Sequence, residues 1–172
     1  MIPFLEFAKL NAPYREELLD AVAEVIDRGN YILAEKVVEF EREFAKFCGV
    51  KHAIGVGNGL DALTLIMRGY KELGILNEGD EVLVPSNTYI ASILSVTENR
   101  LVPVLVEPDL ATYNIDPALL EKKITPKTKA ILTVHLYGQV AYSEVMQRVA
   151  DKYGLKIIED SAQAHGAEWK GK

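Results

Sequence analysis

The sequence predicts an α/β fold in which a mostly parallel β-sheet is flanked by helices. From residue 52 onward, short apolar runs alternate with segments of helical periodicity, which is typical of strands joined by crossover helices. A length of 172 residues with a hydrophobic fraction of 49% is enough for one substantial core. The runs predicted as strands are residues 52–56, 81–84, 102–106, 130–135 and 155–159.

Two amphipathic helices are predicted before the sheet, at residues 13–28 and 35–47. Each has an apolar stripe at helical spacing, formed by Leu18, Val22, Val25 and Ile26 in the first and by Val37, Phe40, Phe44 and Phe47 in the second. We interpret the phenylalanine stripe as core packing. We therefore expect residues 1–50 to form a helical segment and residues 51–172 to form the domain that contains the sheet.

The connection between residues 106 and 130 is predicted to hold a shorter helix than the other connections. Asp116 is a favourable N-cap, because its carboxylate accepts hydrogen bonds from the first free amides of a helix. Pro117 follows it with a backbone angle already set for the first helical position. We expect the helix to begin there.

Charge and cysteine content argue against several classes of partner. The net charge is -6 with both signs interspersed, which gives no footprint for nucleic acid or an anionic membrane. Residues 1–6 lack a basic and apolar leader, and no apolar run is long enough to span a bilayer, so we expect a cytoplasmic protein. The lone Cys48 is interpreted as a small core residue. His52, His135 and His165 lack metal-ligand spacing, so we expect no metal site and a core or loop role for each.

The first unusual loop is the glycine-rich turn at residues 55–59, between a predicted strand and a helix that begins near Leu60. Ligands bind beyond the carboxyl ends of parallel strands, and free amides at a helix start suit phosphate. A tight turn alone explains the glycines equally well. An NAD-dependent Rossmann oxidoreductase is an alternative, but the third glycine of its G-x-G-x-x-G pattern would fall at Leu60.

Two more loops place chemically useful side chains at the same edge. Tyr89 follows the second predicted strand, where its ring could stack on a planar heterocycle or simply pack in the fold. Asp160 follows the last predicted strand, where a carboxylate is costly to bury without a partner. That partner is either a group of the fold or the protonated ring nitrogen of a cofactor.

Taken together, the segments GVGNGLDAL, PSNTYIAS and EDSAQAHGA resemble the DegT/DnrJ/EryC1/StrS family of aminotransferases. MIPFLEF, RGNYIL and VHLYGQ extend the resemblance over essentially the whole chain. The resemblance implies a pyridoxal 5'-phosphate (PLP) enzyme of fold type I, of which residues 51–172 would form part of the large domain. It also implies a homodimer that aminates a nucleotide-linked keto sugar, usually with glutamate as donor, in amino-sugar biosynthesis for polysaccharide or O-antigen.

The resemblance assigns cofactor contacts to individual positions. Asn58, Gly59 and Leu60 match the turn that helps to hold the cofactor phosphate. Tyr89 matches the aromatic residue that stacks on the pyridine ring. The opening segment is most similar to members that aminate the 3-keto position of a dTDP-linked 6-deoxyhexose.

Two further contacts come from the last loop. Asp160 matches the carboxylate that pairs with the ring nitrogen, and Gln163 matches the side chain that hydrogen-bonds the ring hydroxyl. The family lysine that holds the cofactor as a Schiff base is expected beyond Lys172, because Lys170 and Lys172 lie too near Asp160 in sequence. A catalytically inactive truncated homologue or fragment is therefore an alternative for these residues.

The resemblance also has a consequence for the sheet. The family sheet has seven strands, and two that come late in sequence join the first strand to the others. Residues 52–56 would then lie apart from the other four strands and leave unpaired backbone groups. We expect the chain by itself to be poorly stable or to associate through those edges.

Overall fold

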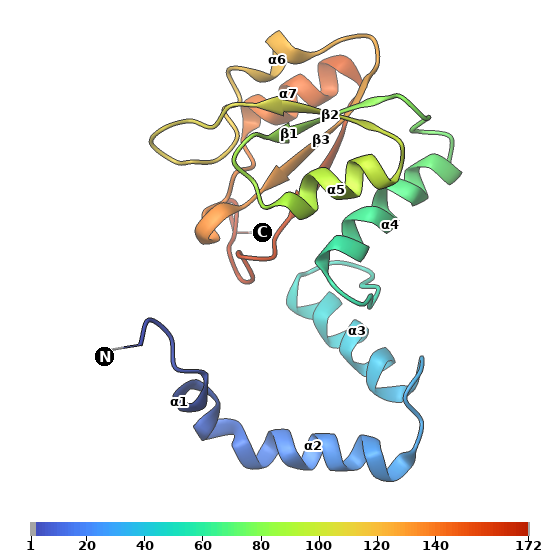
Figure 1. The fold of residues 1–172 in the computed structure, drawn as a ribbon, viewed down its shortest axis with the longest axis vertical. Coiled ribbons are helices and arrows are strands. Elements are labelled where there is room, and N and C mark those ends of the chain that lie inside the picture. Colours follow the sequence, from blue (N-terminus) through green and yellow to red (C-terminus); the bar gives the residue numbers. More distant parts are fainter. Residues whose placement is uncertain (1–2, 172) are drawn as a thin grey trace. The chain divides into compact units, whose positions relative to one another are not determined.

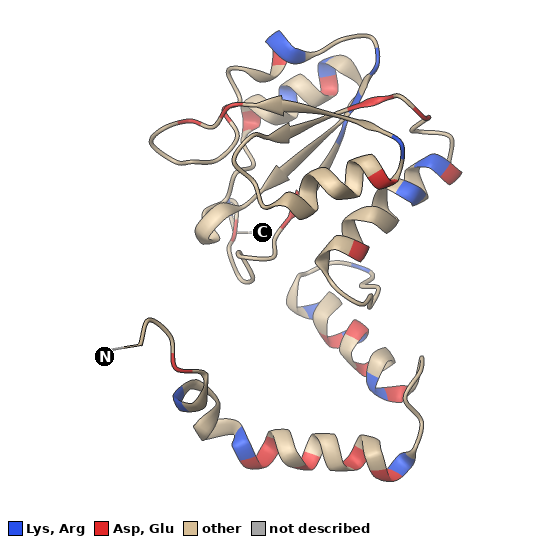
Figure 2. Cartoon of the chain, viewed as in Figure 1, with Lys and Arg blue, Asp and Glu red and all other residues tan. Residues whose placement is uncertain are grey.

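The computed structural model describes residues 3–171. They fall into two compact units, divided between Gly55 and Val56. Figure 1 shows the helices of the first unit (unit 1) and the sheet with its helices in the second (unit 2). Lys and Arg are interspersed with Asp and Glu along the helices of both units (Figure 2). No helix within the described range is both long and apolar enough to cross a bilayer.

Unit 1 is helical. Its elements are α1 (Phe7–Asn11), the 3₁₀ turn η1 (Ala12–Tyr14), α2 (Arg15–Arg28) and α3 (Glu35–Phe47). Pro13 lies in η1, so the first predicted helix is a 3₁₀ turn followed by α2. Gly29 ends α2 in the left-handed conformation that suits glycine (φ 65°).

The apolar faces of these helices are not buried as the sequence led us to expect. Ala45 is the one buried residue among residues 3–55, and the side chains of Phe40 and Phe47 are 57% and 64% exposed. Phe40 stacks on Phe44 with ring centroids 5.4 Å apart, which is a contact within α3. Core packing is therefore wrong for Phe40 and Phe47, because unit 1 has no sheet to cover them. Cys48 is also exposed, which corrects its interpretation as a core residue.

Unit 2 is built on a four-stranded sheet of entirely parallel strands in the order β2-β1-β3-β4. The strands are β1 (Glu81–Pro85), β2 (Val102–Val106), β3 (Thr128–Val134) and β4 (Lys156–Asp160). Each lies within two residues of a predicted strand. Val134 is aligned with Asp160 at the carboxyl edge, where β3 and β4 end together.

Of the five predicted strands, the one at residues 52–56 is absent. A strand is stabilised by hydrogen bonds to a neighbouring strand, and no strand of the described range pairs with this segment. The amide of Gly55 instead donates to the Glu41 side chain, with 2.7 Å between N and Oε1. The segment is therefore an extended connection outside the sheet.

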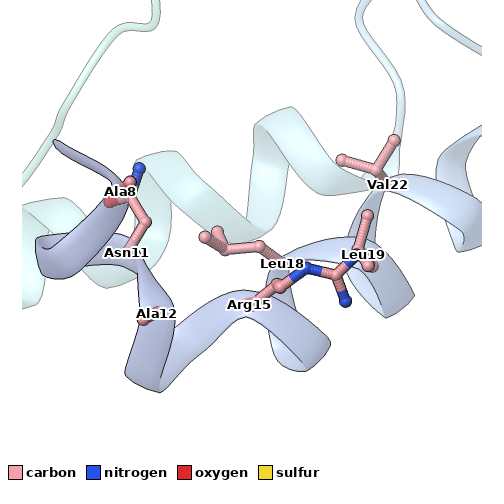
Figure 3. Close-up of a pocket in the computed structure, with 7 residues that line it drawn as sticks. All are labelled: Ala8, Asn11, Ala12, Arg15, Leu18, Leu19 and Val22. Atoms are coloured by element: carbon pink, nitrogen blue, oxygen red, sulfur yellow. The ribbon is translucent and has the colours of Figure 1, made fainter.

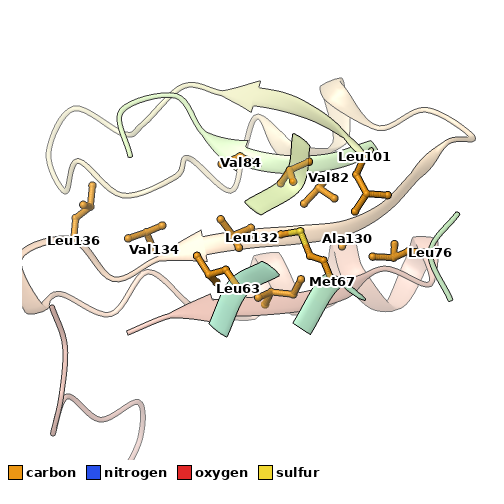
Figure 4. Packing of buried hydrophobic residues seen from close by; sticks show 12 residues of the cluster. Leu63, Met67, Leu76, Val82, Val84, Leu101, Ala130, Leu132, Val134 and Leu136 are labelled. Carbon is orange, nitrogen blue, oxygen red and sulfur yellow. The ribbon is translucent and has the colours of Figure 1, made fainter. Parts of the chain in front are cut away.

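Helices cover both faces of the sheet. On one face, α4 (Gly59–Glu72) and α5 (Ile90–Glu98) pack over a cluster that contains Met67, Val84 and Leu132 (Figure 4). On the other face, α6 (Leu120–Lys123) and α7 (Glu144–Tyr153) pack over a cluster that contains Leu83, Ile131 and Met146. Alternate residues of β1 and β3 enter opposite clusters, as expected for central strands buried on both faces.

The helix predicted to start at Asp116 begins later. Asp116 accepts a hydrogen bond from Ala118 N through Oδ1 at 2.8 Å, which closes a short side-chain turn. The regular helix α6 then starts at Leu120. Asp116 therefore initiates a turn ahead of α6, and its assignment as the N-cap is wrong.

Candidate cofactor site

The candidate site lies at the carboxyl edge of the sheet in unit 2. Tyr89 follows β1, and Asp160 is the last residue of β4. In Figure 4, Leu63 of α4 lies nearer to Val134 than Met67 does, so α4 begins at this same edge. Strand β3 separates β1 from β4, which places these two strands roughly 10 Å apart.

The glycine-rich turn forms the start of α4. Asn58 is its N-cap: Oδ1 accepts from Asp61 N at 3.0 Å, and Nδ2 donates to Asp61 Oδ2 at 3.0 Å. The Asn58 side chain is thus occupied in holding the turn. The amides of Gly59 and Leu60 occupy the first two helical positions, where no intrahelical acceptor exists, so they are suited to an anion.

Gly57 has a steric reason of its own in this turn. A Cβ atom at this position would lie 2.6 Å from Asp61 Oδ2, which is closer than two such atoms approach. The absence of a side chain at Gly57 lets the Asp61 carboxylate reach Asn58. The tight-turn interpretation therefore holds for Gly57, whereas phosphate binding by the amides of Gly59 and Leu60 stays a prediction.

Tyr89 precedes α5 and its side chain is 77% exposed. This exposure is far above that of a residue that packs in the core, so the packing interpretation is wrong for Tyr89. Next to it, Thr88 and Ser92 are hydrogen-bonded through their hydroxyls at 2.8 Å and fix the start of α5. Tyr89 therefore lies at a hydrogen-bonded helix start with its ring exposed to solvent.

Asp160 is anchored at the carboxyl end of β4. Its carbonyl oxygen accepts from His135 N at 3.0 Å, and its Oδ1 accepts from Ala162 N at 3.0 Å. The carboxylate thus has a capping role, which was one of the two alternatives for this residue. The same contact orients the carboxyl group at the edge where ligands bind in parallel sheets.

Gln163 is held by a main-chain group that the sequence analysis did not identify. Its Oε1 accepts a hydrogen bond from Tyr137 N at 2.6 Å. Tyr137 lies in the turn η2 (Leu136–Gly138) after β3 and has a left-handed backbone (φ 57°). The signal in the sequence was the tyrosine–glycine pair in VHLYGQ, which we used for the resemblance but not as a turn.

Two buried polar side chains also support this turn. His135 is 4% exposed and is hydrogen-bonded to Glu159 and to Ala141 N. Asn114, also 4% exposed, contacts Leu136 N and the carbonyl of Gln139. The fold role expected for His135 is confirmed, whereas Asn114 and Glu159 were missed because their partners are distant in sequence.

Hollows elsewhere on the molecule do not include the predicted residues. A groove of about 440 Å³ lies in unit 1, and its lining includes Arg15 and the apolar side chains of Leu18, Leu19 and Val22 of α2 (Figure 3). A second hollow of about 400 Å³ lies between α6 and α7. Neither contains a group that points to the chemistry of the carboxyl edge.

A parallel sheet covered on both faces defines an α/β protein, and its helix start, aromatic ring and carboxylate at one edge form a candidate ligand site. Residues 13–172 match the model of the DegT/DnrJ/EryC1/StrS aminotransferase family. The chain belongs to this family. The match decides against the oxidoreductase alternative that the glycine-rich turn had left open.

Individual relatives agree with the family match. The chain is 57% identical over 172 residues to dTDP-3-amino-3,6-dideoxy-alpha-D-galactopyranose transaminase of Aneurinibacillus thermoaerophilus, covering 100% of this chain and 46% of that protein. It is 48% identical over 171 residues to dTDP-3-amino-3,4,6-trideoxy-alpha-D-glucose transaminase of Streptomyces venezuelae, covering 99% and 44%. The chain therefore spans a little under half the length of these curated relatives.

Solved structures agree with the fold. The crystal structure of S. venezuelae DesV matches with a TM-score of 0.93 and 47% identity, covering 99% of this chain and 45% of that one. NtdA of Bacillus subtilis with bound cofactor PMP matches with a TM-score of 0.88 and 34% identity, covering 96% and 37%. Unit 2 thus contains part of the fold of aminotransferases that use a pyridoxal-type cofactor.

Proposed function

We propose that this chain is part of a PLP-dependent aminotransferase that acts on a nucleotide-linked keto sugar. The observation that carries the proposal is the match along the entire chain, at 57% identity, to a dTDP-3-amino sugar transaminase. The arrangement of the carboxyl edge is the second support. It offers separate groups for a phosphate, for a flat ring and for a positively charged ring nitrogen.

The residues at this edge fit PLP. The amides of Gly59 and Leu60 are at a helix start, where the positive end of the helix dipole favours a phosphate. The exposed ring of Tyr89 would cover one face of the pyridine. Asp160, oriented through Oδ1 by Ala162 N, would pair with the ring nitrogen, and Gln163 would hydrogen-bond the ring hydroxyl.

When bound, PLP supplies an electron-withdrawing ring that lets an amino group be taken from one substrate and given to another. The task of Asp160 is to keep a proton on the ring nitrogen, because a nearby carboxylate favours the charged form. The task of Tyr89 is to hold the ring flat and to exclude water from one of its faces. Asn58 contributes indirectly by fixing the turn through Asp61.

For the substrates, we propose glutamate as the amino donor and a dTDP-linked 3-keto-6-deoxyhexose as the acceptor. The two relatives described above are both transaminases of dTDP-3-amino sugars. A GDP-perosamine synthase of Caulobacter vibrioides is 52% identical over 136 residues, so the nucleotide must be tested directly. Amine product formed from a GDP-linked but not from a dTDP-linked keto sugar would contradict the proposed acceptor.

We propose that the protein acts as a cytoplasmic homodimer. The support is the exposed apolar surface of unit 1, where Leu18, Val22 and Ile26 are each more than half exposed. Apolar surface of this kind is normally covered by another chain. Light scattering after size exclusion would test the dimer, and a monomer at all concentrations would contradict it.

Cofactor binding is the most direct test. The chain is titrated with PLP and separately with NAD, and binding is followed by absorbance and by the fluorescence of Trp169. We expect saturable binding of PLP and none of NAD. Asp160→Asn should weaken PLP binding about tenfold, since a charge-assisted hydrogen bond is lost without a change in size. Glu78→Gln, which removes a carboxylate just before β1 at the opposite edge, should leave binding unchanged.

A further inference from the structure

We infer that Asn114 and His135 are positioning residues: they hold the turn after β3 so that Tyr137 N fixes the amide of Gln163 with its NH₂ group facing the ligand. The inference rests on the proposed function, because it concerns how Gln163 meets a bound cofactor. It goes further in two ways: it makes Gln163 the donor in the hydrogen bond to the cofactor, and it names the residues that fix the orientation of the Gln163 amide.

The direction follows from the chemistry of the contact. A main-chain N–H can only donate, so the atom of Gln163 that lies 2.6 Å from Tyr137 N must be the amide oxygen. This assignment does not depend on distinguishing oxygen from nitrogen in the side chain, because the opposite orientation would set two donors against each other. The remaining group, the NH₂, can only donate to a ligand.

Tyr137 needs support to present its amide in this way. Its backbone is left-handed, with φ 57°, and Gly138 follows with φ 82°. A left-handed conformation is unfavourable for a residue with a side chain. The Tyr137 side chain is 80% exposed, so burial of the ring does not hold the turn in place. The turn has main-chain hydrogen bonds of its own, from Gly138 N to the His135 carbonyl and from Gln139 N to the Leu136 carbonyl, and contacts from other segments add to them.

Asn114 supplies such contacts from the connection after β2. Its Oδ1 accepts from Leu136 N at 3.3 Å, and its Nδ2 donates to the carbonyl of Gln139 at 3.2 Å. The two partners lie on either side of Tyr137 and Gly138. One buried side chain thus closes the turn from both ends.

His135 ties the far end of the turn to the sheet. Ala141 N donates to Nδ1 at 3.0 Å, so Nδ1 carries no proton. The proton is then on Nε2, which donates to Glu159 Oε2 at 2.9 Å. Glu159 precedes Asp160 on β4. The same ring therefore links the turn that holds Gln163 to the strand that carries Asp160.

Gly138 completes the arrangement by allowing close approach. A Cβ atom there would lie 3.3 Å from the carbonyl oxygen of Gln163, and its φ of 82° would strain any other residue. The turn can therefore lie directly against the loop of Gln163.

If the Gln163 amide can only donate to the cofactor, the effect on the cofactor is measurable. An N–H group stabilises an ionised ring hydroxyl more than a neutral one, because a hydrogen bond to a charged acceptor is stronger. Gln163 should therefore lower the pH at which the ring hydroxyl of bound PLP ionises. If the turn is loosened, the donor is less well placed and this pH should rise.

The test is a pH titration of the absorbance of PLP bound to the chain. Gln163→Glu keeps an oxygen for Tyr137 N but loses the donor, and it should raise the pH midpoint by about one unit, since a hydrogen bond to a charged group is lost. Asn114→Leu should raise it by a smaller amount. The matched control is Asn99→Leu: Asn99 is also 4% exposed and also donates to main-chain carbonyls, but it caps the end of α5. It should leave the midpoint unchanged.

The outcomes separate the two proposals. Absence of saturable PLP binding by the unaltered chain would overturn the proposed function. Binding with the same midpoint in the unaltered chain and in Asn114→Leu would overturn only the positioning role. Should Asn114→Leu fail to fold, amide hydrogen exchange in the unaltered chain decides. Tyr137 and Leu136 should both be protected, and Gln163→Leu should expose Tyr137 alone; exchange of Tyr137 at the rate of an open chain would refute the inference.

Discussion

Helices α3 and α7 have the same kind of sequence pattern and different surroundings. Both carry apolar residues at steps of three and four positions. In α7, Met146, Val149 and Ala150 are at most 5% exposed. In α3, Phe40 and Phe47 are more than half exposed. The comparison teaches that periodicity identifies the face of a helix that will be covered, but not whether the cover is present in the same stretch of chain.

The physical difference is the sheet. In unit 2, β1 and β3 are central strands that offer apolar side chains to both faces, so α4 and α7 each find a layer to pack against. Unit 1 consists of helices joined by short turns. Burial contributes roughly 25 cal/mol for each Å² of apolar surface removed from water, so the stability of unit 2 comes from its layers.

The largest effect is expected in the core of unit 2. Leu132 on β3 is 0% exposed and lies among the residues under α4. Leu132→Ala should lower the free energy of unfolding by about 3 kcal/mol, because it loses transfer energy and leaves a cavity. Urea unfolding followed by circular dichroism measures this. A loss below about 1 kcal/mol would mean that the layers of unit 2 are not tightly packed.

A smaller effect of opposite sign is expected next to it. Thr133 is 0% exposed, and within residues 3–171 its hydroxyl has no hydrogen-bond partner. Thr133→Val replaces the hydroxyl with a methyl group of similar size and should stabilise unit 2 by about 1 kcal/mol. The same urea experiment measures the gain. Thr133→Ser keeps the hydroxyl and removes the methyl, so it should destabilise; a destabilised Thr133→Val would show that the hydroxyl is paired.

Much of unit 2 could be predicted from the sequence. Four apolar runs gave strands in nearly the right places. The signal is clearest for β1 and β3, which are buried on both faces and therefore favour apolar residues on both. Residues 52–56 were also predicted as a strand but have no neighbouring strand, and local sequence cannot show pairing. The exposure of Phe40 was unpredictable for the same reason: burial depends on a second surface that local sequence does not describe.

The sequence predicted the location of the candidate site at the carboxyl edge of the sheet, but not the contacts among its residues. The positions of Tyr89 and Asp160 at carboxyl ends follow from topology. The contact between Gln163 and Tyr137 joins residues 26 positions apart, and that between Asn114 and Leu136 joins residues 22 apart. Such contacts depend on how turns meet in space. The assignment of the six residues to a cofactor stays a prediction.

Replacing an exposed aromatic side chain of unit 1 with alanine should have little effect on stability. Phe40 is 57% exposed and contacts Phe44 within its own helix. Phe40→Ala should therefore change the free energy of unfolding by at most about 0.5 kcal/mol, as is usual for surface positions. The measurement uses dilute protein, so that association between chains does not contribute to the free energy of unfolding. A loss as large as that of Leu132→Ala would break the contrast between α3 and α7.

The smallest effect concerns the ion pairs that join α2 to α3. The hydrogen bond from Lys36, 3.0 Å from Glu24 Oε2, holds the pKa of Glu24 below its ordinary value of 4.5. A lowered pKa in the folded state means that the pair stabilises unit 1 above pH 4.5 and that this contribution is lost as the pH falls through the lowered value. Both side chains are exposed, so the effect is small and is screened by salt.

Helicity measured from pH 6 downward in low salt should therefore fall slightly more in the unaltered chain than in Glu24→Gln, which lacks the titrating group. The mid-helix position of Glu24 makes glutamine a neutral replacement in helix propensity, so the difference reports the ion pairs of Glu24 with Lys36 and with Arg28. Addition of salt should abolish the difference, since screening weakens an exposed pair and leaves packing untouched. A difference that persists in salt would indicate that α2 and α3 are joined by buried contacts, contrary to the exposure of their apolar faces.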